Sequence, residues 1–264
     1  MGDLSRDIRL ALSQDLIRPN WELPEPAKTS VQAVCSTRQG GVSLAPFDCL
    51  NLALHVGDCP GTVQKNRQIL QQKAKIPSPV CWLEQQHTTK VVYWQKPPEP
   101  NAVPPIADAS WTDQPGVVLA VMTADCLPIL LTNRAGTLVA AVHAGWKGCL
   151  KGVIEETIAQ LPETPENLMA WIGPCIRQSN FEVGAWIQQA FIDKDAEAAS
   201  CFTPVQAGKT FADLVGLGIL ALQKAGILFE NIYDSGFDSF KQSELFYSYR
   251  RDGQTGRMAS LIWL

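Results

Sequence analysis

The 264-residue chain contains three histidines, His55, His87 and His143, so any imidazole chemistry must use these positions. A multicopper centre of the laccase kind needs roughly ten imidazoles, whereas three suffice for a single metal site. Cys126 adds a thiolate, and two imidazoles with one thiolate match a catalytic zinc whose fourth position stays open. His87, Cys126 and His143 are far apart in the sequence. Their spacing alone therefore does not distinguish a metal site from a buried thiol and a structural histidine.

The same residues fit two other classes of function. Cys126 could act as a nucleophile with His143 as its base, which would make the chain a cysteine hydrolase or deamidase. A metal-stabilised binding module without turnover is the third class. Metal content separates the first two, because a thiolate that ligates zinc is not free to attack a substrate.

The candidate residues follow predicted strands. Apolar, β-branched runs at 117–122, 127–132 and 138–143 predict buried strands, with a hairpin turn at 133–136. Cys126 comes just after the first run, and His143 ends the third and is followed by Gly145. Ligands collect at strand ends in layered α/β folds, so we expect these residues to share one edge of a sheet.

The remaining pattern mixes strands and helices. It predicts strands at 31–37 and 168–172, helices at 62–75, 148–161, 183–192 and 211–225, and a terminal hairpin formed by 245–249 and 258–264. Residues 1–30 form a polar, helical or irregular lead-in, and 31–264 form a single catalytic domain that includes the proline-rich excursion at 97–105. The predicted fold class is α/β (mixed α+β), a layered single domain with central sheets flanked by helices.

Composition restricts the partners. With 46% hydrophobic residues the chain can bury a large core, and its net charge of −4 argues against nucleic-acid binding by bulk charge. The eight cysteines form no C-x-x-C pair, which argues against a zinc ribbon or a thioredoxin-type redox site. The first residues lack an apolar signal segment, and Asp125 interrupts the most apolar run at 116–131. We therefore expect a cytoplasmic protein without a membrane partner, and we favour a monomer.

Several blocks resemble the YfiH-type family, whose members are named polyphenol oxidoreductase, laccase-domain protein or purine nucleoside phosphorylase. The resemblance covers residues 31–264 in the family's order. The blocks are Ser36-Thr37-Arg38-Gln39-Gly40-Gly41-Val42-Ser43, Asn51-Leu52, His55-Val56-Gly57-Asp58, Asn66-Arg67, Gln86-His87, Asp108-Ala109, Thr123-Ala124-Asp125-Cys126-Leu127-Pro128, Val142-His143-Ala144-Gly145-Trp146-Lys147-Gly148, Ile172-Gly173-Pro174-Cys175-Ile176 and Ser248-Tyr249-Arg250-Arg251-Asp252.

The resemblance implies a CNF/YfiH-like fold and a metal-dependent enzyme that acts on purine nucleosides. His87, Cys126 and His143 become zinc ligands, with copper as the alternative metal of the older polyphenol oxidoreductase assignment. The implied reactions are phosphorolysis of adenosine, inosine and methylthioadenosine to free base and ribose 1-phosphate, and deamination of adenosine. Purine nucleoside and phosphate are the implied partners, and Asn66 joins the implied substrate-binding residues.

The chain departs from the family pattern at three positions. Lys147 stands where arginine is common, Trp111 where a small aliphatic residue is usual, and Ser235 where many members have Cys-Thr. Because lysine offers a point charge and no bidentate fork, a phosphate clamp at Lys147 would be weaker.

The implied chemistry needs further side chains. Deamination needs activated water and a proton shuttle, for which Asp125 and Glu182 are candidates; Glu182 could equally cap the helix predicted at 183–192. Phosphorolysis needs cations around phosphate, and the candidates are Arg38, Lys147, Arg250 and Arg251. Arg250 and Arg251 follow a predicted strand, so alternation would direct one of them into the site.

Overall fold

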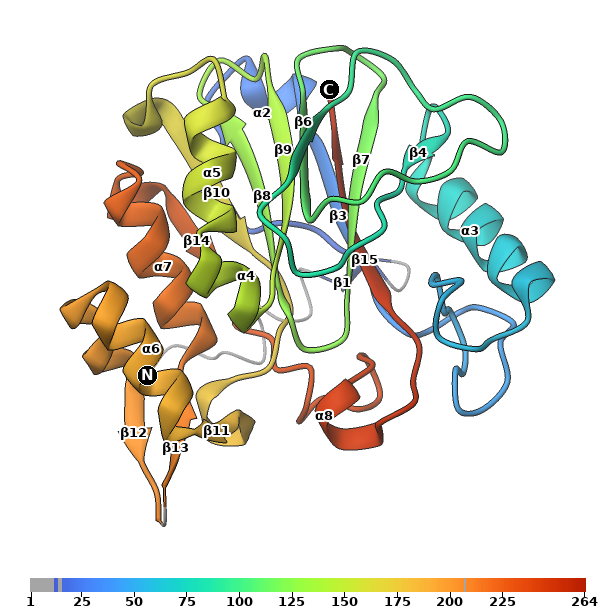
Figure 1. Cartoon of the computed structure of the whole chain (residues 1–264). Helices are drawn as coiled ribbons and strands as arrows, with labels where there is room; N and C mark the ends of the chain where they lie inside the picture. Colours follow the sequence, from blue (N-terminus) through green and yellow to red (C-terminus); the bar gives the residue numbers. More distant parts are fainter. Residues whose placement is uncertain (1–11, 14–15, 207) are drawn as a thin grey trace.

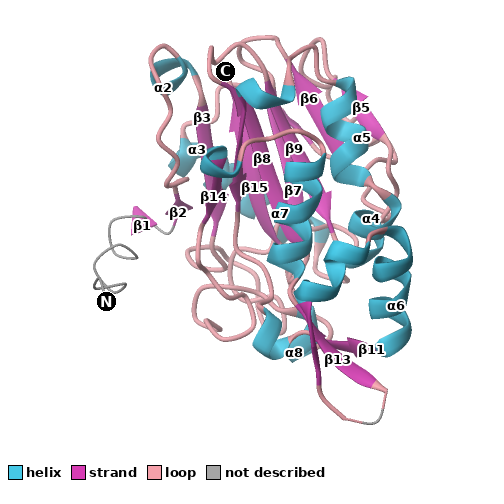
Figure 2. Cartoon of the chain, turned by 90° about the vertical axis from the view of Figure 1, so that its left-hand side faces the viewer, coloured by secondary structure: helices cyan, strands magenta, loops and turns pink. Residues whose placement is uncertain are grey.

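The computed structural model describes residues 12–13, 16–206 and 208–264. Two six-stranded sheets pack face to face, and helices cover the outer faces of both (Figure 1). The layers are therefore helix, sheet, sheet and helix, which confirms the predicted mixed α/β fold. A three-stranded sheet projects from one end of the molecule (Figure 2).

The first sheet is held together by the C-terminal strand. β15 lies between β3 and β7 and pairs antiparallel with both. In spatial order its strands are β1 (Leu12–Ser13), β2 (Leu16–Ile17), β3 (Gln32–Ser36), β15 (Met258–Trp263), β7 (Val118–Thr123) and β4 (Val80–Cys81).

The second sheet contains the predicted hairpin. β8 and β9 pair antiparallel across the turn at 133–136, and β6 pairs antiparallel with β9 on its other side. In spatial order its strands are β14 (Ile232–Asp234), β10 (Leu168–Ile172), β8 (Leu127–Asn133), β9 (Val139–Ala144), β6 (Ala109–Thr112) and β5 (Val91–Tyr93).

Alternation along the strands explains the layers. On β8, Ile129 and Leu131 face the outer helices, whereas Leu130 between them faces the first sheet. On β7, Leu119 and Val121 face the second sheet, whereas the alternate residues Val118, Ala120 and Met122 face the outside. Successive side chains of a strand point to opposite faces, so strands in the middle of four layers are apolar on both.

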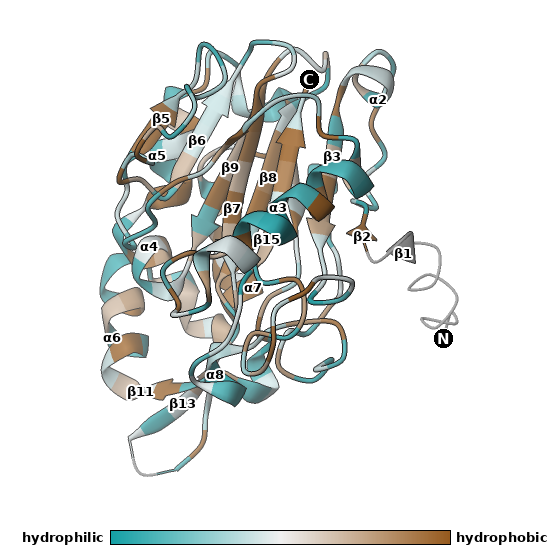
Figure 3. Cartoon of the chain, turned by 90° about the vertical axis from the view of Figure 1, so that its right-hand side faces the viewer, coloured by the Kyte–Doolittle hydropathy of each residue, from teal (hydrophilic) through white to brown (hydrophobic). Residues whose placement is uncertain are grey.

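Helices cover the outside unequally. α3 (Pro60–Ala74) crosses the outer face of the first sheet and presents a polar surface outward (Figure 3). The second sheet is covered by α4 (Trp146–Lys151), α5 (Val153–Gln160) and α7 (Leu214–Lys224), with α6 (Ala185–Lys194) packed beside α4. Within the described part of the chain, none of the helices combines the length and the apolar character that crossing a bilayer requires.

The short elements complete the fold. The three-stranded sheet has the order β11 (Glu182–Gly184), β13 (Lys209–Ala212) and β12 (Phe202–Pro204). Two four-residue helices are α2 (Ala27–Ser30) and α8 (Tyr249–Asp252), and the 3₁₀ helices are Pro165–Asn167, Gln178–Asn180, Ala196–Cys201 and Phe229–Asn231.

The predicted terminal hairpin is wrong. β15 pairs with β3 and β7, while residues 245–248 are irregular and Ser248 caps α8 by accepting a hydrogen bond from the Arg251 N–H at 3.2 Å. Arg250 and Arg251 therefore lie on a helix, so strand alternation does not decide which of them enters the site. Two buried partner strands outweigh the local turn signal at Asp252-Gly253 in setting the position of β15.

Three helix predictions need new bounds. Glu182 to Gly184 and Phe211 to Ala212 belong to strands that pair with one another, so α6 and α7 begin later than predicted. The helix expected at 148–161 is two helices, because Gly152 adopts a left-handed conformation with φ of +96°. In each case pairing or glycine geometry overrides helical periodicity.

Part of the predicted lead-in is strand. β2 pairs with β3, and Leu16 and Ile17 are buried. The expected division of the chain at residue 30 stays a prediction. The expectation that the first residues carry no signal segment concerns residues 1–11, which lie outside the described residues.

The turn of the β8–β9 hairpin yields a stability prediction. Gly136 has φ of +64°, and a Cβ there would lie 2.5 Å from Ala27 Cα. Gly116 has a similar φ of +77° but open space around it. We expect Gly136→Ala to lower the free energy of unfolding by about 2–4 kcal/mol, and Gly116→Ala by about 1 kcal/mol, because only the first adds a steric clash to the strained backbone. Urea unfolding measures both, and equal losses would contradict the packing argument.

Candidate metal centre

Four polar residues meet at one end of the second sheet. Cys126 directly precedes β8, His143 lies near the end of β9, and Asp108 directly precedes β6. His87 lies in the loop before β5, which runs parallel to β6. Because β8, β9 and β6 are antiparallel neighbours, the start of β8, the end of β9 and the start of β6 share one edge.

The strand register fixes which residues face each other. Pro128 is paired with His143, and Ala109 with Val142. The pairing places Cys126 beside the end of β9 and Asp108 opposite His143, whose N–H donates to the Asp108 carbonyl at 2.7 Å. The predicted strand ends therefore come together as expected.

The predicted ligands form a cluster. The candidate ligand atoms of His87, Cys126 and His143 all lie within 4.8 Å of one another, and Cys126 Sγ is 3.7 Å from His87 Nε2. Gly145 makes this approach possible, since a Cβ there would lie 2.8 Å from His87 Nε2 and 2.9 Å from Cys126 Sγ.

The backbone at two of the site residues is strained. His87 and Asp125 have φ of +55° and +95°. Such backbone costs about 1–3 kcal/mol per residue and concentrates at functional sites.

Asp108 connects the two histidines. This fully buried carboxylate accepts from His143 Nδ1 at 2.8 Å and from the His87 N–H at 3.0 Å through Oδ1. Its Oδ2 accepts from the Thr88 hydroxyl at 2.8 Å and from the backbone N–H groups of Gln86 and Thr88. A carboxylate that accepts from Nδ1 leaves Nε2 of His143 to act as a ligand.

The electrostatics favour the thiolate form of Cys126. Burial raises the pKa of Asp108, but the hydrogen bonds from His143 and Thr88 outweigh it and lower that pKa to about 2. Burial also raises the pKa of Cys126, and the charges and hydrogen bonds of His143 and His87 lower it to about 6. Burial lowers the pKa of His143, whereas Cys126 and Asp108 raise it to about 9. The site thus stabilises a thiolate, the form of cysteine that binds metal.

The donor set fits a metal ion. Two imidazole nitrogens and one sulfur converge, a carboxylate orients one imidazole, and the cluster opens on a cavity that leaves room for a further ligand. His87, Cys126 and His143 would hold the ion.

The cavity beside the cluster has a volume of about 420 Å³. Besides the three clustered residues, its lining includes three predicted site residues, Asp125, Lys147 and Arg250. Asp125 accepts from the Ser239 hydroxyl and from the Arg250 N–H, both at 2.7 Å. His55 also lines the cavity but is not part of the cluster.

Three other predicted binding residues do not line this cavity. Arg38 donates to the Asp48 side chain at 3.0 Å and stacks over Tyr247. Arg251 donates to the carbonyls of Ser239, Phe240 and Phe246. Asn66 is fully buried in α3, where its amide bonds Ser43 and the carbonyls of Cys49 and Asn51. These contacts stabilise loops around the site.

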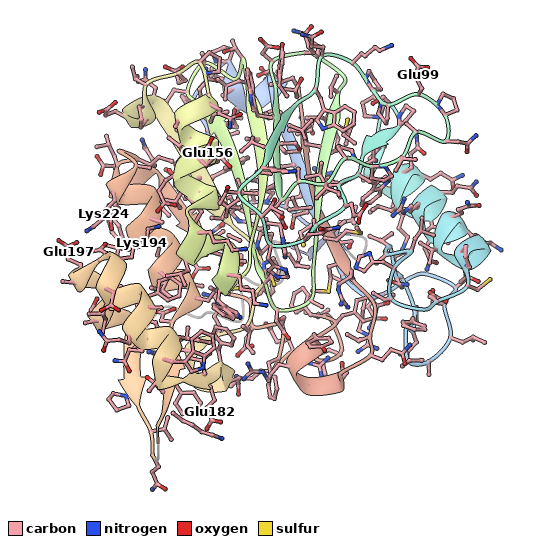
Figure 4. All side chains as sticks on the ribbon, in the orientation of Figure 1. Glu99, Glu156, Glu182, Lys194, Glu197 and Lys224 are labelled. Carbon is pink, nitrogen blue, oxygen red and sulfur yellow. The ribbon has the colours of Figure 1, made fainter. Side chains whose placement is uncertain are left out.

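The position of Glu182 fits neither of its predicted roles, the proton shuttle and the helix cap. It lies in β11, and its carboxylate pairs with Lys209 at 2.7 Å. Figure 4 shows Glu182 at the lower side of the molecule, near the three-stranded sheet. It is not among the residues that line the cavity.

Asp108, Thr123 and Arg257 are site residues for which the sequence predicted no role. Thr123 and Arg257 line the cavity, and Asp108 lies behind the cluster. Asp108 and Thr123 occur in the motif blocks. Their burial and hydrogen bonding depend on how the strands pair, so the sequence gives no local signal that they belong to the site. Arg257 follows Gly256 in the tail, where nothing local indicates a site.

Asp108 yields a prediction on metal affinity. In Asp108→Asn, the side-chain amide either turns its N–H₂ group toward His143 or leaves the N–H groups that Asp108 binds without an acceptor. The first arrangement favours the imidazole tautomer with its proton on Nε2, which cannot bind metal through that nitrogen. We expect affinity for added zinc, measured by chelator competition, to fall about 10- to 100-fold. Asp113→Asn is the matched control, because Asp113 follows the other end of β6 and bonds Tyr93. Unchanged zinc affinity in a folded Asp108→Asn protein would contradict this role.

Known proteins share both the sequence and the fold. The chain is 47% identical over 250 residues to the purine nucleoside phosphorylase YfiH of Escherichia coli strain K12, which covers 94% of this chain and 98% of that protein. The crystal structure of a Neisseria meningitidis protein superposes with a TM-score of 0.88 at 43% identity, covering 95% of this chain and 99% of that one. YlmD from Geobacillus stearothermophilus gives a TM-score of 0.87 at 28% identity, covering 96% and 97%.

A family model agrees with these likenesses. The model described as multi-copper polyphenol oxidoreductase laccase matches residues 32–264. The chain therefore belongs to this laccase-like family, the YfiH-type family whose motifs its sequence carries.

Proposed function

We propose that the chain is a zinc-dependent purine nucleoside phosphorylase. Its substrates would be adenosine, inosine and methylthioadenosine, its products the free base and the sugar 1-phosphate, and the same cavity would deaminate adenosine. The observation that carries the proposal is the cluster of His87, Cys126 and His143 opening on a cavity lined by cations. The name of the Escherichia coli relative supports the phosphorylase activity.

The cavity suits both substrates. Its volume of about 420 Å³ falls within the range of small-ligand sites. Met122, Ile176, Phe181 and Leu214 provide apolar surface for a purine. Lys147, Arg250 and Arg257 provide positive charge for phosphate, and Asp125 is the carboxylate in the lining.

The chain's own residues would perform distinct tasks. In phosphorolysis a phosphate oxygen bonds to C1′ as the bond from C1′ to the purine nitrogen breaks, and the leaving purine takes a proton. The cavity cations would hold the phosphate, and Asp125 would move the proton needed in either reaction. When bound, zinc supplies a Lewis acid and activates water near neutral pH.

A cysteine hydrolase remains the second candidate. The low pKa of Cys126 and its contact with His143 are also what a nucleophilic dyad requires. A multicopper oxidase is disfavoured by composition, since the whole chain has three histidines and a centre of that kind needs roughly ten.

Metal content separates the first two candidates. We expect about one zinc per chain by elemental analysis of protein purified without added metal, a sharp loss in Cys126→Ser and in His143→Ala, and full occupancy in His55→Ala, because His55 is outside the cluster. Zinc-loaded protein should resist alkylation of Cys126 by iodoacetamide. Full occupancy in Cys126→Ser, or an active metal-free protein inactivated by iodoacetamide, would favour the dyad.

The nucleoside reaction is tested with and without phosphate. We expect inosine to release hypoxanthine only when phosphate is present, with arsenate as a substitute, because the anion is the attacking nucleophile. Conversion of adenosine to inosine should not depend on phosphate. Chromatographic analysis of the products measures both reactions, with Cys126→Ser as the inactive control. Base release that ignores phosphate would contradict the phosphorylase assignment.

A further inference from the structure

Arg257 is one of the cations that line the cavity. Its side chain is half-buried and lines the cavity, and Nη1 donates to the carbonyls of Thr255 and Gly256, each at 2.9 Å. Among the described residues, no carboxylate pairs with it, and its Nε and Nη2 have no hydrogen-bond partner. Burial lowers the pKa of Arg257, against the opposing effect of the Cys126 and Asp125 charges. A guanidinium held in this way is stabilised by an anion.

Thr123 adds a buried hydroxyl to the lining of the same cavity. Thr123 is 2% exposed and lines the same cavity, and its Oγ1 has no hydrogen-bond partner among the described residues. The register pairs Thr123 at the end of β7 with Met258 at the start of β15, the residue after Arg257. A buried hydroxyl without a hydrogen-bond partner costs free energy, so this position favours a ligand or water that accepts a hydrogen bond from it.

His55 is brought to the same place by the loop that carries it. The Arg257 N–H donates to Asn51 Oδ1 at 3.0 Å, and the Arg257 carbonyl accepts from Leu52 at 3.3 Å. On the other side of His55, the Val56 carbonyl accepts from Gln254 Nε2 at 3.2 Å. These contacts fasten the segment around His55 to the segment that precedes β15. His55 thereby lies in a loop fastened to the segment that carries Arg257, and both residues line the cavity.

The other cations of the cavity are placed differently. Arg250 donates through Nη1 to the Glu182 carbonyl at 2.7 Å and lies against Phe181, and Lys147 is exposed beside Trp146. Arg257 is the cavity cation whose strand register places it next to Thr123, a cavity residue with a buried hydroxyl that has no partner among the described residues.

We propose that Arg257, Thr123 and His55 form an oxyanion subsite whose occupant is inorganic phosphate. The identity of the anion rests on the proposed function, in which phosphate is a substrate. The purine would then lie toward the apolar wall of the cavity. Arg250 and Lys147 would contribute charge at its rim.

Phosphate binding tests the subsite directly. Titration calorimetry of zinc-loaded protein with inorganic phosphate should show binding to the wild type. Arg257→Gln should weaken this binding about tenfold or more, and Thr123→Val about threefold to tenfold, because charged and neutral hydrogen bonds differ in strength. Arg134→Gln is the matched control, since Arg134 lies at the far end of β8 and bonds Asn231. Equal zinc content would show that the variants keep the neighbouring cluster.

Kinetics provides a second readout. In the phosphorolysis assay, Arg257→Gln should raise the KM for phosphate about tenfold while the KM for the nucleoside changes much less. Arg257→Lys keeps the charge but loses the paired N–H donors of the guanidinium, so its KM for phosphate should lie between those of the wild type and Arg257→Gln. If Arg257→Gln fails to fold, Thr123→Val decides the matter, because removal of an unpartnered hydroxyl should not destabilise the protein.

The outcomes separate this inference from the proposed function. Phosphate binding that depends on Arg257 and Thr123 in a protein without phosphorylase activity would support the subsite and reject only the reaction. No phosphate binding to the wild type would overturn the subsite. So would binding that survives Arg257→Gln and is lost in Arg250→Gln.

Discussion

The pairing of β6 with β9 is the constraint on which the site depends. It sets Asp108 opposite His143 and brings a buried carboxylate within 2.8 Å of the imidazole. The same carboxylate accepts from the loop that carries His87. A shift of one residue in this register would turn the side chains of β6 to the opposite face and separate the two histidines. The apolar packing of both faces of the second sheet prevents that shift.

The site combines this rigid edge with segments from distant parts of the chain. The candidate ligands come from β9 and from the loops before β5 and β8, whereas Arg250 and Arg257 come from α8 and the segment before β15. The backbone of Arg257 is bound to Asn51, whose neighbours Leu52 and Ala53 pack against the first sheet. Cations and candidate ligands therefore reach one cavity from separate parts of the chain.

Much of the fold could be predicted from local pattern. The strands β7, β8, β9 and β10 are continuous apolar runs, and the helix α3 has buried residues at helical spacing. Apart from the helix that Gly152 divides, the predictions that are wrong concern segments with a distant partner. β15 finds β3 and β7 on either side, and Glu182 to Gly184 pairs with β13. No neighbour in sequence carries information about these pairings, because they depend on hydrogen bonds to strands far along the chain.

For the site, the sequence by itself determined which donors exist and that Cys126 and His143 lie at the ends of predicted strands. Residue type and count are enough for that, since three histidines limit the possible metal chemistry. Only the tertiary structure decided which polar residues share the cavity. It separated Arg38, Asn66 and Arg251, whose hydrogen bonds go to loops, from Lys147 and Arg250, which line the cavity. It also identified Asp108 and Arg257, because burial and the presence or absence of a partner are properties of the packed chain.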